Sequence, residues 1–468
     1  METPGVSDDE EFFDAFETTM QLKLNLSNID IETKSLDSLS VAESEPKQIE
    51  NSHSPLYDST PQIFLSDYST YNSLSHKDPD LSKSNISTPS IKNLIKKHHK
   101  DYFEFADAEQ IQEIDLDSNT SNKILVLKFS PDGRFLAISG QNPEIKLYEV
   151  YRQRVHGPQN LFYDVPYNVM IGHTLPVLDI SWSQSSTYFL SASEDWNVFL
   201  WSIANSTSVL QFKHPNTVSC VCFHPFNANH FLSGCHDKTV RIWNIPNYTV
   251  VCSAEAPEII TAGSFTPNGD LILLGLLHGQ CLVYEPQFEE EKLNLLTQIN
   301  CKNSRGRKSM GRRVTGFDFL DEQQALITTN DSRMRLYNLK DFTLKQKYKG
   351  LVNEKFPIKS TFSHNLMHAV SGSENGCIYV WNTYCTWAPK INPIFSRKKN
   401  FKNYSYECFP ASNTRALCSA IFAPDKVVKE VQTRNKSSKS DHIVSHIVVV
   451  ACEGKLKIFY NQFKIMTW

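Results

Sequence analysis

An acidic stretch with two adjacent phenylalanines lies close to the start of this 468-residue chain. Residues 8 to 17 read Asp-Asp-Glu-Glu-Phe-Phe-Asp-Ala-Phe-Glu. The chemistry of such a stretch is that of binding, because clustered carboxylates speed the encounter with a basic surface and buried aromatic side chains supply most of the lasting affinity. We therefore expect the carboxylates of residues 8 to 10 to steer a partner, and Phe12 and Phe13 to anchor it.

The segment around this stretch is predicted to be accessible. Residues 1 to 60 contain 14 Asp or Glu and three Lys, with Ser and Asn throughout. Such a segment has too little apolar surface to repay the entropy lost on folding by itself. Residues 1 to 98 are therefore predicted to form a disordered, acidic Ser/Asn-rich region that connects the stretch to a folded domain.

Residues 11 to 17 resemble, at all six defining positions, the two-phenylalanines-in-an-acidic-tract (FFAT) motif. The resemblance implies docking on the MSP domain of VAP, a tail-anchored receptor of the endoplasmic reticulum, with Phe12 and Ala15 in shallow pockets and Asp14 near a basic residue. The alternative is an acidic amphipathic tail whose phenylalanines fold back on the chain's own domain. The expected VAP-binding residues are Asp8, Asp9, Glu10, Glu11, Phe12, Phe13, Asp14, Ala15 and Glu17.

Composition excludes several classes of protein. The eleven cysteines form no CxxC pair, so they predict buried thiols in a reducing compartment and neither a disulfide framework nor a metal site. The sequence has no apolar run of about 18 residues and no signal peptide, which predicts a cytoplasmic protein that borrows any membrane location from a partner. A net charge of -4 gives no general attraction to nucleic acid.

A repeated unit begins near residue 99. It contains a strand of alternating apolar and polar residues, a turn, a strand of small residues, a polar turn and a strand that ends in an aromatic residue. A short polar or acidic residue stands six positions before each terminal aromatic, where it can bond the backbone of its own tight turn. The strands with aromatic ends are residues 145–148, 198–201, 240–243, 281–284, 334–337, 378–381 and 456–459.

This pattern resembles the WD40 repeat. The resemblance implies an all-β fold, a seven-bladed WD40 β-propeller over residues 99 to 468, closed by a strand predicted within residues 102 to 117. A histidine near an aspartate also suggests catalysis, but the repeat spacing favours a structural network. The residues expected in that network are His173, Asp195, Trp201, Asp237, Trp243, Asp331 and Trp381.

Basic residues gather in three long connections, residues 286–313, 383–416 and 425–441. If these share a face they fit an anionic membrane or an acidic protein surface, and the alternative is that they are solvated loops. The basic loops lack the interleaved aromatic residues typical of nucleic-acid binding. The candidate anionic-surface contacts are Arg305, Arg307, Lys308, Arg312, Arg313, Arg397, Lys398 and Lys399.

Segments such as 172–182, 223–234 and 329–333 further resemble the WD-repeat-containing protein 44 (rabphilin-like) family. The resemblance implies VAP docking and binding of a Rab-family small GTPase, although relatives carry a much longer N-terminal region. We therefore expect a non-enzymatic adaptor without cofactors, peripheral at the endoplasmic reticulum membrane and engaged in membrane trafficking or at contact sites.

Two alternatives stay open. The first is a WD40 substrate receptor of a cullin-type ubiquitin ligase, although the chain has Trp243-Asn244 and Trp381-Asn382 where such receptors carry Trp-Asp-x-Arg/Lys. The second is an enzyme, which is disfavoured because no P-loop, GxSxG, HExxH or Gly-rich nucleotide motif is present.

Overall fold

The computed structural model describes residues 105, 108–116, 122–151, 160–302, 312–383, 402–403, 406–412, 414, 416–437 and 442–464. The chain divides into two units, Met1–Thr88 and Pro89–Trp468, and all of the described residues belong to the second. The predicted docking stretch at residues 8 to 17 and the predicted disordered region lie outside the described residues. No helix in the described part of the chain is both long and apolar enough to cross a bilayer.

The described strands form six sheets, and the largest of these consists of two four-stranded groups joined by one parallel pair, Ser253 with Lys292. Seven four-stranded groups result, within which neighbouring strands are antiparallel. Group 1 contains β2 (Ile124–Phe129), β3 (Phe135–Gly140), β4 (Ile145–Glu149) and β5 (Asn168–Met170). Group 2 contains β6 (Val177–Trp182), β7 (Tyr188–Ser193), β8 (Asn197–Ser202) and β9 (Ser208–Lys213). Group 3 contains β10 (Val218–Phe223), β11 (His230–Cys235), β12 (Thr239–Asn244) and β13 (Thr249–Glu255).

The remaining groups follow the same plan. Group 4 contains β14 (Ile260–Phe265), β15 (Ile272–Leu276), β16 (Gln280–Gln287) and β17 (Lys292–Asn300). Group 5 contains β18 (Val314–Asp321), β19 (Gln324–Thr329), β20 (Arg333–Asn338) and β21 (Leu344–Lys349), with the two-residue strand β25 (Lys402–Asn403) parallel to β21. Group 6 contains β22 (Ser360–Phe362), β23 (His368–Ser371), β24 (Cys377–Asn382) and β26 (Tyr406–Pro410). Group 7 contains β27 (Cys418–Phe422), β28 (His442–Cys452), β29 (Lys455–Lys464) and β1 (Glu109–Asp115), and the helix α3 (Asp425–Ser437) connects β27 with β28.

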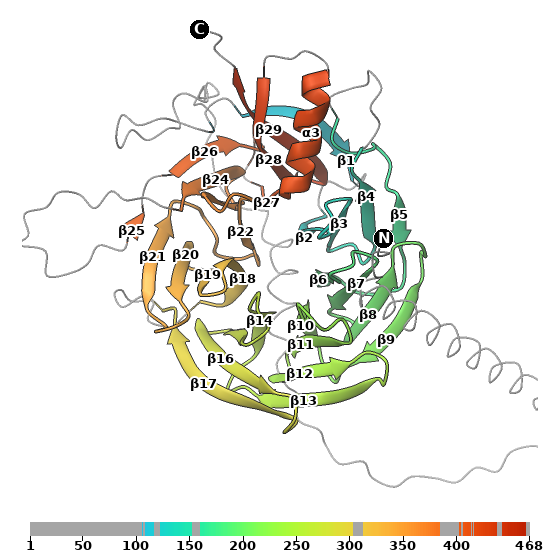
Figure 1. Ribbon diagram of the computed structural model, residues 1–468, viewed down its shortest axis with the longest axis vertical. Helices are drawn as coiled ribbons and strands as arrows, with labels where there is room; N and C mark the ends of the chain where they lie inside the picture. The colour runs from blue at the N-terminus through green and yellow to red at the C-terminus, as the bar shows by residue number, and fades with distance from the viewer. Residues whose placement is uncertain are drawn as a thin grey trace, which may run out of the picture. The chain divides into compact units, whose positions relative to one another are not determined.

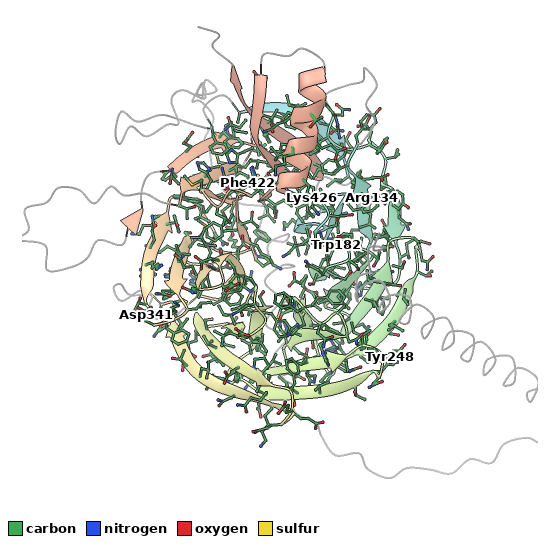
Figure 2. All side chains as sticks on the ribbon, viewed as in Figure 1. Arg134, Trp182, Tyr248, Asp341, Phe422 and Lys426 are labelled. Atoms are coloured by element: carbon green, nitrogen blue, oxygen red, sulfur yellow. The ribbon has the colours of Figure 1, made fainter. Side chains whose placement is uncertain are left out.

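The first strand of each group lies innermost, and these inner strands contact one another in circular order. β2 contacts β6, the contacts continue through β10, β14, β18 and β22 to β27, and β27 contacts β2 again (Figure 1). The architecture is an all-β propeller. Each predicted strand with an aromatic end lies on the third strand of its group, and aromatic side chains such as Trp201 and Trp381 are buried. Side chains fill the spaces between the sheets around the ring (Figure 2).

Sheets that are covered on both faces explain the strand composition. All six residues of β3 and all five of β15 are buried, so these strands are continuous apolar or small runs and do not alternate. The inner strands are more polar, since their unpaired edges line the central channel. Val177 and Trp182 of β6 are buried at its two ends, whereas Ser181 between them is half-buried.

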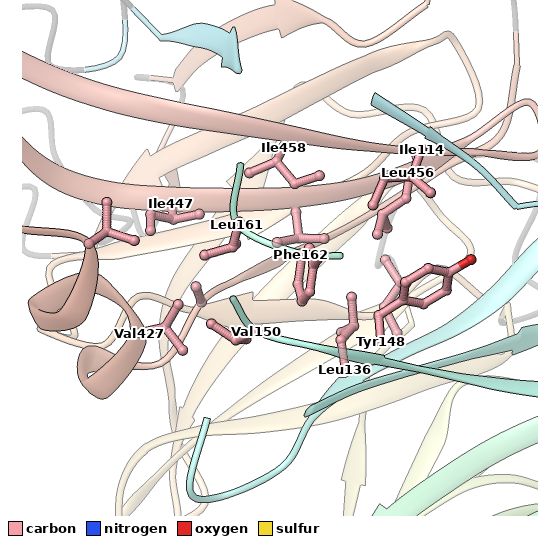
Figure 3. Close-up of a cluster of buried hydrophobic side chains, with 14 of the residues drawn as sticks. Ile114, Leu136, Tyr148, Val150, Leu161, Phe162, Val427, Ile447, Leu456 and Ile458 are labelled. Atoms are coloured by element: carbon pink, nitrogen blue, oxygen red, sulfur yellow. The ribbon is translucent and has the colours of Figure 1, made fainter. Parts of the chain in front are cut away.

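The ring is closed by β1, which comes before group 1 in the sequence but pairs antiparallel with β29 of group 7. The side chain of Gln112 also connects β1 to group 1, because its Nε2 donates to Phe162 O at 2.8 Å and its Oε1 accepts the N–H of Leu161 at 2.8 Å. Ile114 packs in the core cluster shared by groups 1 and 7 and by α3 (Figure 3). β1 lies within the segment predicted to close the ring.

We predict that Ile114→Ala destabilises the domain by about 2–4 kcal/mol, because it removes buried apolar volume at the junction of groups 1 and 7. Urea-induced unfolding, followed by far-UV circular dichroism, measures the change. The control is Glu109→Ala, an exposed position on the same strand, which is expected to change stability by less than about 0.5 kcal/mol. Equal effects of the two changes would contradict a role of β1 in closure.

Candidate functional site

The inner strands place charged side chains inside the central channel. Asp179 of β6 forms an ion pair with Lys359, the residue that directly precedes β22. This pair spans the channel, because groups 2 and 6 are not neighbours in the ring. Gly316 of β18 makes room for the lysine, since a Cβ at this position would approach Lys359 Cγ to 2.9 Å.

A second acid lies on β18 in group 5. Oδ2 of Asp318 accepts the N–H of Phe362 in group 6 at 2.6 Å, and Oδ1 accepts the N–H of Phe319 at 3.0 Å. Burial raises the pKa of Asp318 to about 6, although the Phe362 N–H and the charge of Lys128 on β2 both act to lower it. Asp179 makes the equivalent link between groups 2 and 3, where its Oδ2 accepts the N–H of Val221 at 3.3 Å.

Hydroxyl groups continue these links around the channel. In four places the second residue of an inner strand donates to a carbonyl at the start of the next inner strand or two residues before it. Between β18 and β22, the links from Thr315 to Ile358 and from Phe362 to Asp318 follow the same order along both strands, so these two strands run in the same direction. The four bonds are Ser219 Oγ to Ile260 O (2.7 Å), Thr261 Oγ1 to Val314 O (2.7 Å), Thr315 Oγ1 to Ile358 O (2.6 Å) and Ser419 Oγ to Ile124 O (3.2 Å).

The channel contains a cavity of about 60 Å³, lined among others by Lys128, Asp179, Cys222 and Lys359. This volume suits a few water molecules, whereas sites for organic ligands enclose roughly 300–1,000 Å³. The charged side chains here are also occupied with one another and with backbone groups of the next strand. These side chains therefore stabilise the ring, and this cavity is too small for an organic substrate.

The predicted structural network forms in group 2. Nδ1 of His173 lies 2.8 Å from Oδ2 of Asp195, and its Nε2 lies 2.6 Å from Oγ of Ser191. Nε1–H of Trp201 donates to the same Ser191 oxygen at 2.8 Å. Burial opposes ionisation of Asp195, but hydrogen bonds from His173 and from the backbone of Thr174 hold the pKa of its carboxyl below the usual value.

Serine, histidine and aspartate in this order are also the groups of a hydrolytic triad. Two observations exclude that role for this trio. The side chains of His173 and Asp195 are 0% and 5% exposed, and Ser191 is fully buried, so a substrate has no access to the serine oxygen. That oxygen also accepts the indole N–H of Trp201, which fixes it in the core.

The other groups vary the network. In group 3, His214 and Trp243 share Ser233 Oγ at 2.9 Å each, while Asp237 binds Arg241 at 2.6 Å and does not bind the histidine. Burial, and secondarily the charge of Arg241, lowers the pKa of His214 to about 4, so this imidazole is neutral at pH 7.

Two further groups replace the network altogether. In group 5, Asp331 forms an ion pair with Arg335. In group 6, Nε1–H of Trp381 donates to Lys349 O at 3.0 Å. The predicted residues therefore make structural contacts. Among the described groups, the complete histidine–aspartate network is found in group 2.

The described parts of the basic connections lie at both faces of the ring. Arg312 and Arg313 lie at the face where the inner strands begin, because they directly precede β18. α3 follows β27 and so lies at the opposite face, where its basic residues Lys429 and Arg434 pair with the acids four positions before them. The condition that the basic connections share one face is thus not met by these residues. The other candidates, Arg305, Arg307, Lys308, Arg397, Lys398 and Lys399, lie outside the described residues.

Sequence reasoning missed the channel charges and the two serines of the networks. A signal for the charges is present, because Asp179 and Asp318 interrupt strands whose neighbours are apolar or small. Ser191 and Ser233 occupy the same position in β7 and β11, ten residues before the tryptophan that they bond. A search for serine at this spacing would have found both.

Comparisons with known proteins agree with this architecture. The family model for the WD domain, G-beta repeat, matches residues 165–202 and 206–244, which run from β5 of group 1 to β12 of group 3. The chain therefore contains WD40 repeats. WD repeat-containing protein 44 of Xenopus laevis is 37% identical over 324 residues, which are 65% of this chain and 34% of that protein. The resemblances to the WD40 repeat and to WD repeat-containing protein 44 are thereby confirmed, whereas the FFAT motif lies outside the described residues and stays a prediction.

Two further relatives are more distant. A WD repeat-containing protein of Schizosaccharomyces pombe is 26% identical over 340 residues, covering 67% of this chain and 56% of that protein. The 2-deoxy-glucose resistant protein 2 of Saccharomyces cerevisiae is 26% identical over 338 residues, covering 64% of this chain and 39% of that protein. The matched part of the chain thus spans between about a third and just over half of the length of these relatives.

We predict that Ser191→Ala lowers the free energy of unfolding by about 1–3 kcal/mol, since it leaves His173 and Trp201 without their shared buried partner. Chemical denaturation measures this change, and Ser206→Ala, at an exposed position of the same group, serves as the control. If the two variants were equally stable, the network would not hold group 2 together.

A second prediction concerns pH. Because the pKa of Asp318 is raised to about 6, the folded protein binds a proton there as pH falls through 6, while the unfolded chain binds it only near 4. Relative to Asp318→Asn, the wild type is therefore expected to gain stability as pH falls from 7 to 5, by at most about 1.4 kcal/mol per pH unit. Urea unfolding of both proteins at several pH values measures the difference, and a constant difference would contradict the raised pKa.

Proposed function

We propose, from the premise that this chain contains WD40 repeats, that it is a non-enzymatic adaptor with two binding parts. One part is the acidic stretch at residues 8 to 17, which docks on the MSP domain of VAP. The other is the propeller, which presents a second surface to a partner. In this proposal the seven strand groups are the blades of one closed ring, and residues 18 to 98 are a tether that sets its reach.

The observation that carries the docking proposal is the sequence of the stretch itself. Two adjacent aromatic residues within a run of carboxylates, followed by Asp14 and a small Ala15, provide anchors and charge for a basic, grooved surface. The likeness to WD repeat-containing protein 44 supports the same assignment, since the resemblance to that family implies an FFAT motif. Docking of this kind would place the protein at the cytoplasmic side of the endoplasmic reticulum membrane.

The geometry of the propeller supports an adaptor more than a catalyst. The trio that looks most like a catalytic site, His173 with Asp195 and Ser191, is buried and fully bonded. The channel cavity has room for a few water molecules. Because the buried side chains of the ring stabilise the fold, its surface and its loops remain for recognition. A Rab-family GTPase and an anionic membrane are the partners that we propose for this surface.

The test is the affinity of the full chain for a purified VAP MSP domain, measured by isothermal titration calorimetry. Loss of a buried aromatic anchor costs about 2 kcal/mol or more, so Phe12→Ala is expected to weaken binding by about 30-fold. Phe64→Ala removes an aromatic from the same N-terminal region but outside the motif, and is expected to leave the affinity within about twofold.

The contrary results are also defined. Absence of saturable binding by the wild-type chain would refute VAP docking. Equal losses in the Phe12 and Phe64 variants would show that binding depends on general hydrophobicity and not on the motif.

A further inference from the structure

The turn between the second and third strands has the same backbone conformation in most groups. In six of the seven groups the residue directly before the third strand has a positive φ, between 61° and 82°. Glycine adopts this conformation without steric cost, whereas a bulky side chain there is an outlier. Group 2 therefore carries a tryptophan at a position where three other groups have glycine. The six residues are Trp196, Lys238, Gly279, Ser332, Gly376 and Gly454.

The tryptophan in this turn is also exposed. Trp196 is 53% exposed, and Leu175, on the connection that leads into the same group, is 43% exposed. The N–H of Glu194 donates to Pro176 O at 3.0 Å, so the backbone next to Leu175 lies against the turn that carries Trp196. Single exposed apolar residues are common on soluble proteins. Here two large ones lie together, and one of them has a backbone conformation of the strained kind that gathers at functional sites.

Two lysines accompany the apolar pair. Lys213 lies directly opposite Asn197, the residue after Trp196, in the register of β8 and β9. Lys238 holds the equivalent turn position in group 3, the next group along the ring. Both lysines are exposed, and in the described part of the chain neither pairs with a carboxylate. We call four residues the tryptophan patch, namely Leu175, Trp196, Lys213 and Lys238.

The patch lies at the face of the ring where the inner strands begin. Val177 at the start of β6 is paired with Ser193 at the end of β7, and the turn at residues 194–196 follows directly. In group 3, Val218 at the start of β10 is likewise paired with Cys235 at the end of β11. Both turns therefore lie at this face, as does the connection into β6, so one partner can contact them together.

We propose that the tryptophan patch binds a short segment of a partner protein in which carboxylates stand next to a large apolar side chain. The indole of Trp196 and the side chain of Leu175 would cover the apolar group, and the two lysines would attract the carboxylates. Binding of this kind gives the tryptophan a role that a glycine could not fill at the same turn. The inference names a partner chemistry for the propeller surface of the proposed adaptor and rests on that role, but it does not depend on VAP docking.

The shallow shape of the patch favours a protein over a membrane. The domain itself covers about half of Trp196 and more than half of Leu175. A membrane anchor must reach about 5–10 Å into the headgroup region, which half-covered side chains do not do. Thr174 and Asn216, both exposed, border the apolar pair with polar groups, as the polar rim of a protein interface borders its anchors.

The experiment selects peptides from a phage-displayed library of random 12-residue sequences on the immobilised full chain. Each round includes depletion on the Trp196→Gly variant, which introduces the residue type of groups 4, 6 and 7 and is therefore expected to fold. Its melting temperature verifies this. The consensus peptide is then synthesised with a fluorescein label, and its affinity for the wild-type chain and for each variant is measured by fluorescence anisotropy.

Two matched controls accompany the patch variants. Phe226→Ala removes an aromatic residue that is 77% exposed in the turn after β10, at the opposite face of the ring. K213E/K238E reverses the two patch charges, and K340E/K345E makes the same change of net charge at two exposed lysines of group 5.

The proposal predicts a consensus in which Asp or Glu stands close to a large apolar residue. The affinity of this peptide is expected to fall about tenfold or more in Trp196→Gly and several-fold in K213E/K238E, and to stay within about twofold in both controls. It is also expected to fall with rising salt.

Several results would overturn the proposal. These are the absence of any enriched peptide, a consensus without acidic residues, and equal losses in the patch and control variants. Binding of vesicles containing 30% phosphatidylserine that depends on Trp196, without an enriched peptide, would overturn it in favour of a membrane. The affinity for the VAP domain is expected to be the same in Trp196→Gly as in the wild type, so it reports separately on the motif at residues 8 to 17.

Discussion

Closure of the ring by β1 is the constraint on which the rest of the fold depends. Lys455 of β29 pairs with Glu113 of β1 across 342 positions of sequence. Joining the ends of so long a flexible segment costs about 5 kcal/mol of chain entropy, by the logarithmic dependence on loop length. Burial of Ile114 and Leu116 returns about 3–6 kcal/mol, which is of the same size. β1 therefore has little margin by itself, and its docking must be cooperative with formation of the groups between which it lies.

The channel explains how the groups cooperate. Each of the bonds from Ser219, Thr261 and Thr315 joins one group to a carbonyl at or just before the first strand of the next, so an inner strand satisfies its neighbour's backbone as well as its own sheet. The ion pair of Asp179 with Lys359 adds a link between groups that are not adjacent. The carboxylate of this pair is buried, so removal of the lysine alone would be destabilising because it would leave a buried charge without its partner. The interior of the ring is thus organised to make partial structures unfavourable.

The sequence was sufficient for the repeating part of the fold. The third strand of each group was located from its alternating pattern and its terminal aromatic residue, because that aromatic side chain fills the same wedge between two sheets in every group. The sequence also distinguished a structural histidine from a catalytic one at His173, since its spacing to Trp201 is that of the repeat. It could not show that Asp237 prefers Arg241 to a histidine, because that choice depends on the side chain that lies four residues further along the same strand. Nor could it show that Arg312 and α3 lie at opposite faces, since strand direction at each connection follows from the assembled ring.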